Sequence, residues 1–179
     1  MSIKEKKYIL IKNFLDEKQK NLLFHYCRIK HLNNTTSFDT VQNNNFDTHF
    51  HGDPLTDSLL LTKRKIIEKE SGLELLPTYS FWRMYSYGSD LKKHTDRESC
   101  EISVTFNIAA DVLWPIYMGG KAVFLEPGDG VIYLGCEVEH WREPFEGDYS
   151  AQCFLHYVDK NGPNTEWYRD KRRYIGEPK

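Results

Sequence analysis

The feature that most constrains the fold is a change in sequence texture after Pro77. From this point, short segments rich in β-branched and aromatic residues follow one another, separated by turns that contain glycine or proline. Aromatic and other large side chains alternate from Tyr79 to Tyr87, which predicts a strand with one face of that character. Three further strand-like segments are CEISVTFNIA, KAVFLEPGDGVIYLG and SAQCFLHYVD.

The first 72 residues read differently. YILIKNF (8–14) predicts a strand, and two stretches with helical spacing follow at 16–29 and 57–72, separated by a polar loop at 33–54. We therefore expect a mainly β fold with supporting helices (α+β), in which the helices pack on a β-sandwich or open barrel. The single domain, 1–179, divides into an N-terminal strand and helices (1–72), a β-rich part (73–160) and a polar tail (161–179).

Composition excludes several classes of protein. The net charge of −2 argues against a dedicated nucleic-acid or membrane binder, and no apolar run approaches the roughly 20 residues that span a bilayer. The first ten residues, MSIKEKKYIL, lack the apolar core of a signal peptide, which predicts a cytoplasmic protein. The four cysteines form no C-x-x-C pair, so we expect buried thiols rather than a structural zinc site.

A histidine and an aspartate stand two residues apart in KKHTDRESCEIS. Side chains at i and i+2 of a strand point to the same side, so His94 and Asp96 can aim at one point. His140 follows 46 residues later, at the end of PGDGVIYLGCEVEH. Two histidines and one carboxylate can bind one face of an octahedral metal and leave positions open, the arrangement of non-haem Fe(II) oxygenases.

Other interpretations of these residues stay open. The H-x-D pair alone fits a polar surface turn, in which Asp96 forms a salt bridge with Arg97 or Lys93. His156, on the strand-like segment CFLHYV, could replace His140 as a ligand or serve as a hydrogen-bonded residue of the core or pocket.

With these motifs, the chain resembles the 2-oxoglutarate- and Fe(II)-dependent oxygenases, in their prolyl 4-hydroxylase-like branch and its bacterial and phage members. The resemblance covers about residues 73–160 and includes Tyr85, nine residues before His94, and the GG–PGD–His140 series. It implies a double-stranded β-helix (a jelly roll of the cupin type) in which His94, Asp96 and His140 bind Fe(II). It also implies 2-oxoglutarate and O2 as co-substrates, succinate and CO2 as products, and ascorbate as a supporting reductant.

One departure from the family concerns the distal carboxylate of 2-oxoglutarate. The family places an arginine or lysine nine to eleven residues after the distal histidine, where positions 149–151 here hold YSA. Arg142 is the first substitute, because it lies two residues after His140 and would point the same way on a strand. The alternative for Arg142 is an ion pair with Glu139 or Glu143.

Three further residues are candidates for contact with 2-oxoglutarate. Arg83 is the second choice for the anchor, on the strand face that also carries Tyr85. Tyr85 is a candidate hydrogen-bond donor, although aromatic residues on such a strand are often core residues. Thr105 matches a position from which the family often supplies a hydroxyl group.

The resemblance implies hydroxylation of a C–H bond, and we expect a prolyl or other peptidyl residue as substrate, with the 33–54 loop closing over a peptide or protein. A free amino acid or small molecule is the second expectation, and a nucleic-acid substrate is not expected. Two alternatives from other classes are a non-catalytic cupin-like module that binds a metal or a small acid, and a protein interaction module.

Overall fold

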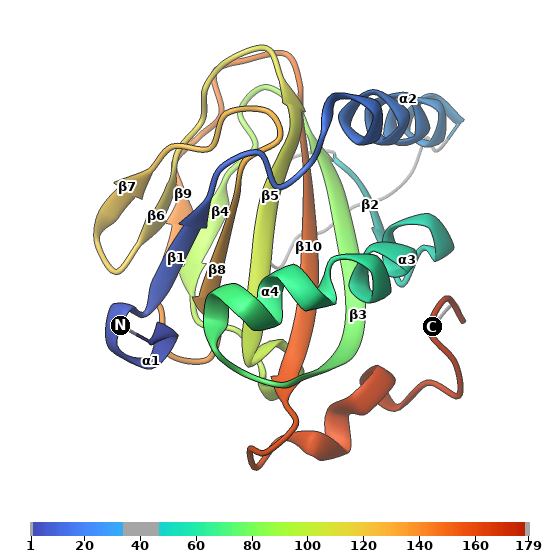
Figure 1. Cartoon of the computed structure of the whole chain (residues 1–179). Helices are drawn as coiled ribbons and strands as arrows, with labels where there is room; N and C mark the ends of the chain where they lie inside the picture. Colours follow the sequence, from blue (N-terminus) through green and yellow to red (C-terminus); the bar gives the residue numbers. More distant parts are fainter. Residues whose placement is uncertain (1, 34–46, 178–179) are drawn as a thin grey trace.

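Two antiparallel sheets face each other in the computed structural model, which describes residues 2–33 and 47–177 (Figure 1). The helical elements are α1 (Ile3–Lys6), α2 (Glu17–Asn33), α3 (Pro54–Thr62), α4 (Arg64–Ser71), η1 (Glu98–Cys100) and η2 (Thr165–Lys171). The strands are β1 (Tyr8–Ile11), β2 (Thr48–His51), β3 (Leu75–Tyr85), β4 (Leu91–His94), β5 (Ile102–Ala110), β6 (Ile116–Met118), β7 (Lys121–Val123), β8 (Gly130–Leu134), β9 (His140–Arg142) and β10 (Ser150–Asp159).

The larger sheet has the order β1-β8-β5-β10-β3-β2 and the smaller one the order β4-β9-β6-β7. Helices α2, α3 and α4 lie against one side of the larger sheet, and the smaller sheet lies on its other side (Figure 1). Because β10 is central and covered on both faces, all ten of its residues are buried. The predicted mainly β architecture with supporting helices is confirmed.

Strand β3 divides its side chains between two layers. Trp82 and Met84 are buried in the hydrophobic core, where the Trp82 ring stacks on Phe50 at 5.0 Å between centroids. The alternate residues, among them Phe81 and Arg83, line a cavity on the other face of the strand. The alternation predicted from Tyr79 onward therefore separates core residues from cavity residues.

The helix predicted over residues 57–72 is two helices. Helix α3 begins earlier, after Asp53, whose carboxylate accepts a hydrogen bond from the backbone N–H of Leu55. The chain bends at Lys63, where the ammonium group turns inward and donates to the backbone carbonyl of Phe14. Gly72 ends α4 in the left-handed conformation (φ 74°), as predicted. None of the helices in the described residues is long and apolar enough to cross a membrane.

The predicted loop at 33–54 contains a strand that its polar sequence did not reveal. Residues Thr48–His51 form β2, which pairs antiparallel with β3 at the edge of the larger sheet. Residues 34–46, which include most of the segment expected to close over a peptide, lie outside the described residues.

The C-terminal segment is anchored rather than loosely attached. The guanidinium of Arg172 is buried, forms an ion pair with Asp57 (Nη1–Oδ2 2.8 Å) and donates to the carbonyl of Thr78 at 2.9 Å. The backbone N–H of Gly176 also donates to Asp57, at 2.8 Å. A polar tail was expected for 161–179, either at the surface or as one last partly ordered turn. The structure ties it to α3, and no local signal revealed this, because Arg172 lies 115 residues after Asp57.

Candidate metal and co-substrate site

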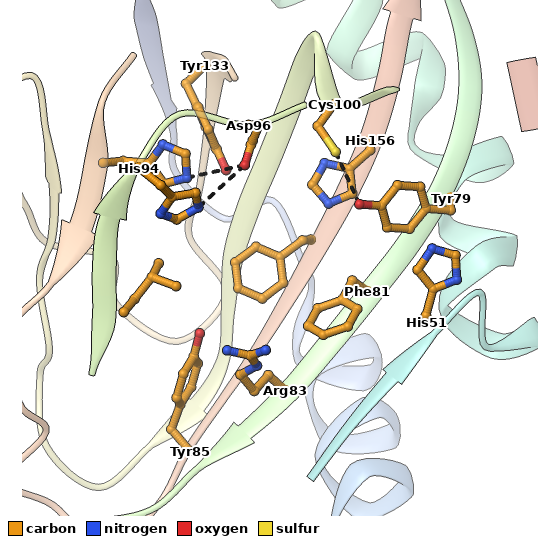
Figure 2. A pocket seen from close by; sticks show the side chains of 13 residues that line it. His51, Tyr79, Phe81, Arg83, Tyr85, His94, Asp96, Cys100, Tyr133 and His156 are labelled. Atoms are coloured by element: carbon orange, nitrogen blue, oxygen red, sulfur yellow. Dashed lines mark hydrogen bonds and ion pairs between the residues drawn. The ribbon is translucent and has the colours of Figure 1, made fainter. Parts of the chain in front are cut away.

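A cavity of about 270 Å³ lies between the two sheets. Figure 2 shows three groups of side chains around it. His94 and Asp96 lie at one side, Arg83 and Tyr85 at a second, and the aromatic and imidazole rings near His156 at a third. The cavity thus brings together residues from β2, β3, β4, β8, β9 and β10.

The structure brings His94, Asp96 and His140 together. His94 ends β4 and His140 begins β9, and the two are direct partners across these antiparallel strands. Each histidine places Nε2 3.6 Å from Oδ1 of Asp96. One possible ligand atom from each of the three residues lies within 4.8 Å of the other two.

Backbone carbonyls orient both imidazoles. Nδ1 of His94 lies 2.6 Å from the carbonyl of Lys92, and Nδ1 of His140 lies 2.8 Å from that of Val138. A carbonyl accepts only, so each Nδ1 carries the hydrogen, and whenever the ring is neutral Nε2 keeps a lone pair on the side of Asp96. This is the tautomer that a metal ligand of this kind requires. The hydrogen bond from Nε2 of His94 to Asp96 forms when His94 is protonated.

Electrostatics favour the ligand forms of Asp96 and His140. For His94, burial opposes protonation, but the hydrogen bonds to Asp96 and to the carbonyl of Lys92 outweigh burial and raise the pKa of the ring, so this ring must lose a proton to bind a metal. Burial opposes ionisation of Asp96, but the hydrogen bond with His94 and the nearby imidazoles outweigh it and lower the pKa of the carboxyl group. Burial lowers the pKa of His140, so its ring is neutral at physiological pH. An ionised carboxylate next to a neutral imidazole is the protonation state that binds a divalent metal.

The alternative ion pairs of Asp96 are not formed. Arg97 pairs instead with Asp170 (3.2 Å), and Lys93 with Glu139 (2.8 Å). The interpretation of H-x-D as a polar turn held by these two cations is therefore wrong.

Arg142 lies on the side of β9 that also carries His140, as its spacing predicted. Its guanidinium is buried and donates to the carbonyl of Trp114 (2.6 Å) and the amide oxygen of Gln152 (3.3 Å). Its Nε has no hydrogen-bond partner among the described residues, and no carboxylate among them forms an ion pair with it. Burial lowers the pKa of Arg142 to about 10.

The alternative partners of Arg142 are used elsewhere. Glu139 pairs with Lys93, and the Glu143 carboxylate accepts a hydrogen bond from Nε1 of Trp141 at 2.9 Å. The predicted ion pair at the strand end is therefore wrong, and within the described residues the buried charge of Arg142 meets two neutral acceptors and the ring of Trp114, 4.7 Å away.

Arg83 lines the cavity, but its charge is compensated. Its Nε lies 2.9 Å from Oδ2 of Asp47, and both side chains are buried. Tyr85 is also buried at the cavity wall, and burial raises the pKa of its phenol, which therefore remains a hydrogen-bond donor. Figure 2 shows Arg83 and Tyr85 side by side along β3.

Thr105 is fully buried on β5, directly opposite Phe154 of β10, whose ring lines the cavity. Directly paired residues of two strands share a face of the sheet, so Thr105 faces the space between the sheets. Its hydroxyl group has no hydrogen-bond partner among the described residues. A buried hydroxyl without a partner is uncommon, and a bound polar ligand would supply one.

Solved structures resemble this chain, whereas no model of a protein family and no curated protein matches its sequence. A prolyl 4-hydroxylase of Pseudomonas putida is 17% identical, and the match covers 87% of this chain and 94% of that one, with a TM-score of 0.67. The non-haem α-ketoglutarate-dependent carbocyclase SnoK from nogalamycin biosynthesis is 14% identical over 98% and 90%, with a TM-score of 0.73. A prolyl hydroxylase of Trichoplax adhaerens, solved with a peptide of hypoxia-inducible factor, is 15% identical over 88% and 86%, with a TM-score of 0.60.

The chain has the fold of the 2-oxoglutarate- and Fe(II)-dependent oxygenases. This confirms the predicted double-stranded β-helix. In the oxygenase fold of this chain, the predicted triad and the four predicted co-substrate residues all lie between the sheets or at the cavity wall.

Sequence reasoning missed three polar residues of this region. Ser103 and Gln152 stand two residues from Thr105 and Phe154 on the same strand faces, so the period-two pattern contained a signal for them. Asp47 had no such signal, because it lies outside the predicted strands and meets Arg83 only through the fold. Ser103 donates to Oδ2 of Asp96 at 3.0 Å and is taken up again below.

Proposed function

We propose that the protein is an Fe(II)- and 2-oxoglutarate-dependent dioxygenase that hydroxylates a C–H bond. The observation that carries this proposal is the convergence of His94 Nε2, Asp96 Oδ1 and His140 Nε2 beside a cavity, in a chain with the oxygenase fold. Arg142, a buried arginine without a carboxylate partner among the described residues, does not line this cavity but lies near Tyr85 and Tyr133, which do, and its free charge fits a dicarboxylate co-substrate.

The donor set fits iron. Two neutral imidazoles and one carboxylate suit Fe(II) and leave positions open for other ligands. When bound there with 2-oxoglutarate and O2, the iron would supply the oxidising power, with succinate and CO2 as products of the co-substrate. The contribution of the chain is to hold the three ligand side chains in place and to surround them with buried residues.

Arg142 is the proposed anchor of the distal carboxylate of 2-oxoglutarate. A guanidinium grips a carboxylate through two parallel hydrogen bonds, and a buried charge is costly until it has such a partner. Arg142 also contacts Gln152 of β10, next to the positions 149–151 where the family carries its basic residue. The guanidinium from β9 would thus replace a basic side chain from β10.

The phenol of Tyr85 and the hydroxyl of Thr105 are the proposed hydrogen-bonding groups for the same co-substrate. Both are buried on the inner side of the larger sheet, and Thr105 has no other partner among the described residues. Arg83 is the weaker candidate for the anchor, because Asp47 already balances its charge.

For the substrate, we propose a prolyl or other peptidyl residue of a peptide or protein. The support is the similarity in fold to prolyl hydroxylases, one of which was solved with a peptide. A free amino acid or small molecule is the second candidate, favoured by the TM-score of 0.73 with the carbocyclase SnoK. A cytoplasmic location remains a prediction from the sequence.

The test is succinate formation from 2-oxoglutarate by purified protein with Fe(II), ascorbate and air. Each reaction is run alone, with a pool of proline-containing peptides and with a pool of free amino acids, and Asp96→Ala is the control. We expect succinate to rise with one pool and to vanish in Asp96→Ala because the metal loses its carboxylate. No succinate from wild-type protein that binds iron would contradict the proposal and favour a non-catalytic binding module.

A further inference from the structure

The two oxygens of the Asp96 carboxylate have different surroundings. Oδ1 faces the two histidines of the triad, at 3.6 Å from each Nε2. Oδ2 faces away from them and accepts a hydrogen bond from the hydroxyl of Ser103 at 3.0 Å. One oxygen is thus available for a metal while the other is held by the protein.

Ser103 connects Asp96 to a further histidine. Ser103 lies on β5 directly opposite His156 of β10, and its Oγ is 2.9 Å from Nδ1 of His156. The same oxygen is 3.0 Å from the backbone carbonyl of Cys100. Ser103 is fully buried, and within the described residues its hydroxyl has these three hydrogen-bonding atoms around it, with the phenol of Tyr133 from the paired strand β8 also nearby.

Gly135 leaves the space that this arrangement needs. A Cβ atom there would come within 2.6 Å of Asp96 Oδ2 and 2.9 Å of Ser103 Oγ, and closer still to the carbonyl of Cys100. The backbone carbonyl of Gly135 also accepts a hydrogen bond from the N–H of Asp96 at 2.9 Å. The turn after β8 is therefore shaped around the carboxylate and its serine.

The position of the hydrogens follows from counting donors. Ser103 has one hydroxyl hydrogen, and both the Asp96 carboxylate and the Cys100 carbonyl can only accept. If the hydrogen pointed at His156, two bare oxygens would face the serine oxygen at 3.0 Å without a proton between them. The hydrogen therefore goes to an oxygen, and Nδ1 of His156 must donate its own hydrogen to Ser103.

This order of hydrogens determines what His156 presents to the cavity. Its ring is buried and neutral, because burial lowers the pKa of His156 to about 4. A neutral imidazole with hydrogen on Nδ1 has an unprotonated Nε2. His156 lines the cavity next to Tyr79, and no described residue donates a hydrogen bond to its Nε2.

We propose that Ser103 and His156 are positioning residues for Asp96, and that the same hydrogen-bonded chain presents Nε2 of His156 to the cavity as an acceptor. The group it would receive is an N–H or O–H of the substrate, close to the carbon that is oxidised. The statement about the substrate rests on the proposed oxygenase function, whereas the order of hydrogens does not.

The first experiment locates the hydrogens. Long-range ¹H–¹⁵N spectra of the metal-free protein, labelled in its histidine rings, distinguish the two neutral tautomers, and His156→Gln assigns the signals. We expect hydrogen on Nδ1 and none on Nε2 in the wild type, and a mixture of tautomers in Ser103→Ala. Hydrogen on Nε2 in the wild type would overturn the inference.

The second experiment measures the dissociation constant for Mn(II) as a probe of the triad. Loss of a hydrogen bond that orients a ligand typically weakens metal binding about 10- to 100-fold, and we expect this for Ser103→Ala, with partial recovery in Ser103→Thr. Ser80→Ala is the matched control, because that buried serine bonds Asp57 on the far side of β3 and should lower the melting temperature only. Unchanged Mn(II) affinity in Ser103→Ala would overturn the positioning role.

The two experiments test the metal site and the hydrogen-bonded chain independently. If the wild type binds no Mn(II), the proposed metal site is contradicted, and the tautomer of His156 still decides whether the hydrogen-bonded chain exists. If Mn(II) binds to the wild type but Ser103→Ala and the control Ser80→Ala lose affinity equally, the loss reflects general stability and the positioning role is rejected.

Discussion

Two buried arginines of the inner layer differ in the partners that surround their guanidinium groups. Arg83 of β3 has an aspartate, Asp47, at 2.9 Å. Arg142 of β9 has a carbonyl, an amide oxygen and the ring of Trp114, and no carboxylate among the described residues. Both are almost completely buried, so burial alone does not mark a binding residue. A buried guanidinium without an anion is the one that stands to gain from binding a carboxylate.

The largest effect is expected when the ion pair between Arg83 and Asp47 is broken. Asp47→Ala should lower the free energy of unfolding by about 3–5 kcal/mol, because it removes the buried carboxylate that lies 2.9 Å from the buried guanidinium of Arg83. Urea unfolding of the metal-free protein measures this. The double variant Asp47→Ala with Arg83→Met should recover much of the loss. A loss below about 1 kcal/mol in the single variant would mean that Arg83 is balanced elsewhere.

The second effect concerns the uncompensated arginine. Arg142→Ala should raise the concentration of 2-oxoglutarate needed for half-maximal succinate formation about 10- to 150-fold, because a hydrogen bond to a charged group contributes about 1.5–3 kcal/mol. The matched control is the double variant Asp47→Asn with Arg83→Gln, which removes the other pair of charges. If the control shifts the requirement and Arg142→Ala does not, Arg83 is the anchor.

The smallest effect concerns the hydroxyl of Thr105. This hydroxyl has no hydrogen-bond partner among the described residues, just as the guanidinium of Arg142 has no carboxylate partner among them. Thr105→Val keeps the shape and should weaken 2-oxoglutarate binding about 2- to 10-fold, the value of one neutral hydrogen bond. Unfolding stability should stay equal or rise slightly, because the hydroxyl has no partner to lose in the free protein. Titration calorimetry and urea unfolding give the two numbers, and a loss of stability without loss of affinity would refute the assignment.

The difference between these arginines also marks what the sequence could predict. The position of Arg142 was predictable because two-residue spacing places it on the same side of its strand as His140, and the same spacing placed His94 with Asp96; His140 itself was found from the segment PGDGVIYLGCEVEH that it ends. The state of Arg83 was not, because Asp47 lies 36 residues earlier and reaches it only through the pairing of β2 with β3.

Elements fixed by local signals were predicted better than those fixed by distant partners. The strand alternation after Pro77 and the glycine that ends α4 are local, and the structure has both. At the bend, Lys63 donates to the carbonyl of Phe14, almost fifty residues away, a contact that no local pattern encodes. Strand β2 is similar, since its four residues form a strand only because β3 offers an edge.

The buried pair of Arg172 with Asp57 has a consequence for how the chain tolerates shortening. Asp57 is fully buried in α3 and is neutralised by Arg172, seven positions before the last residue of the sequence. Removing Arg172 and the residues after it would not merely trim a polar end. It would leave the buried carboxylate of Asp57 without its arginine, next to the sheet that lines the cavity. A truncated chain should therefore be destabilised in its interior rather than at its surface.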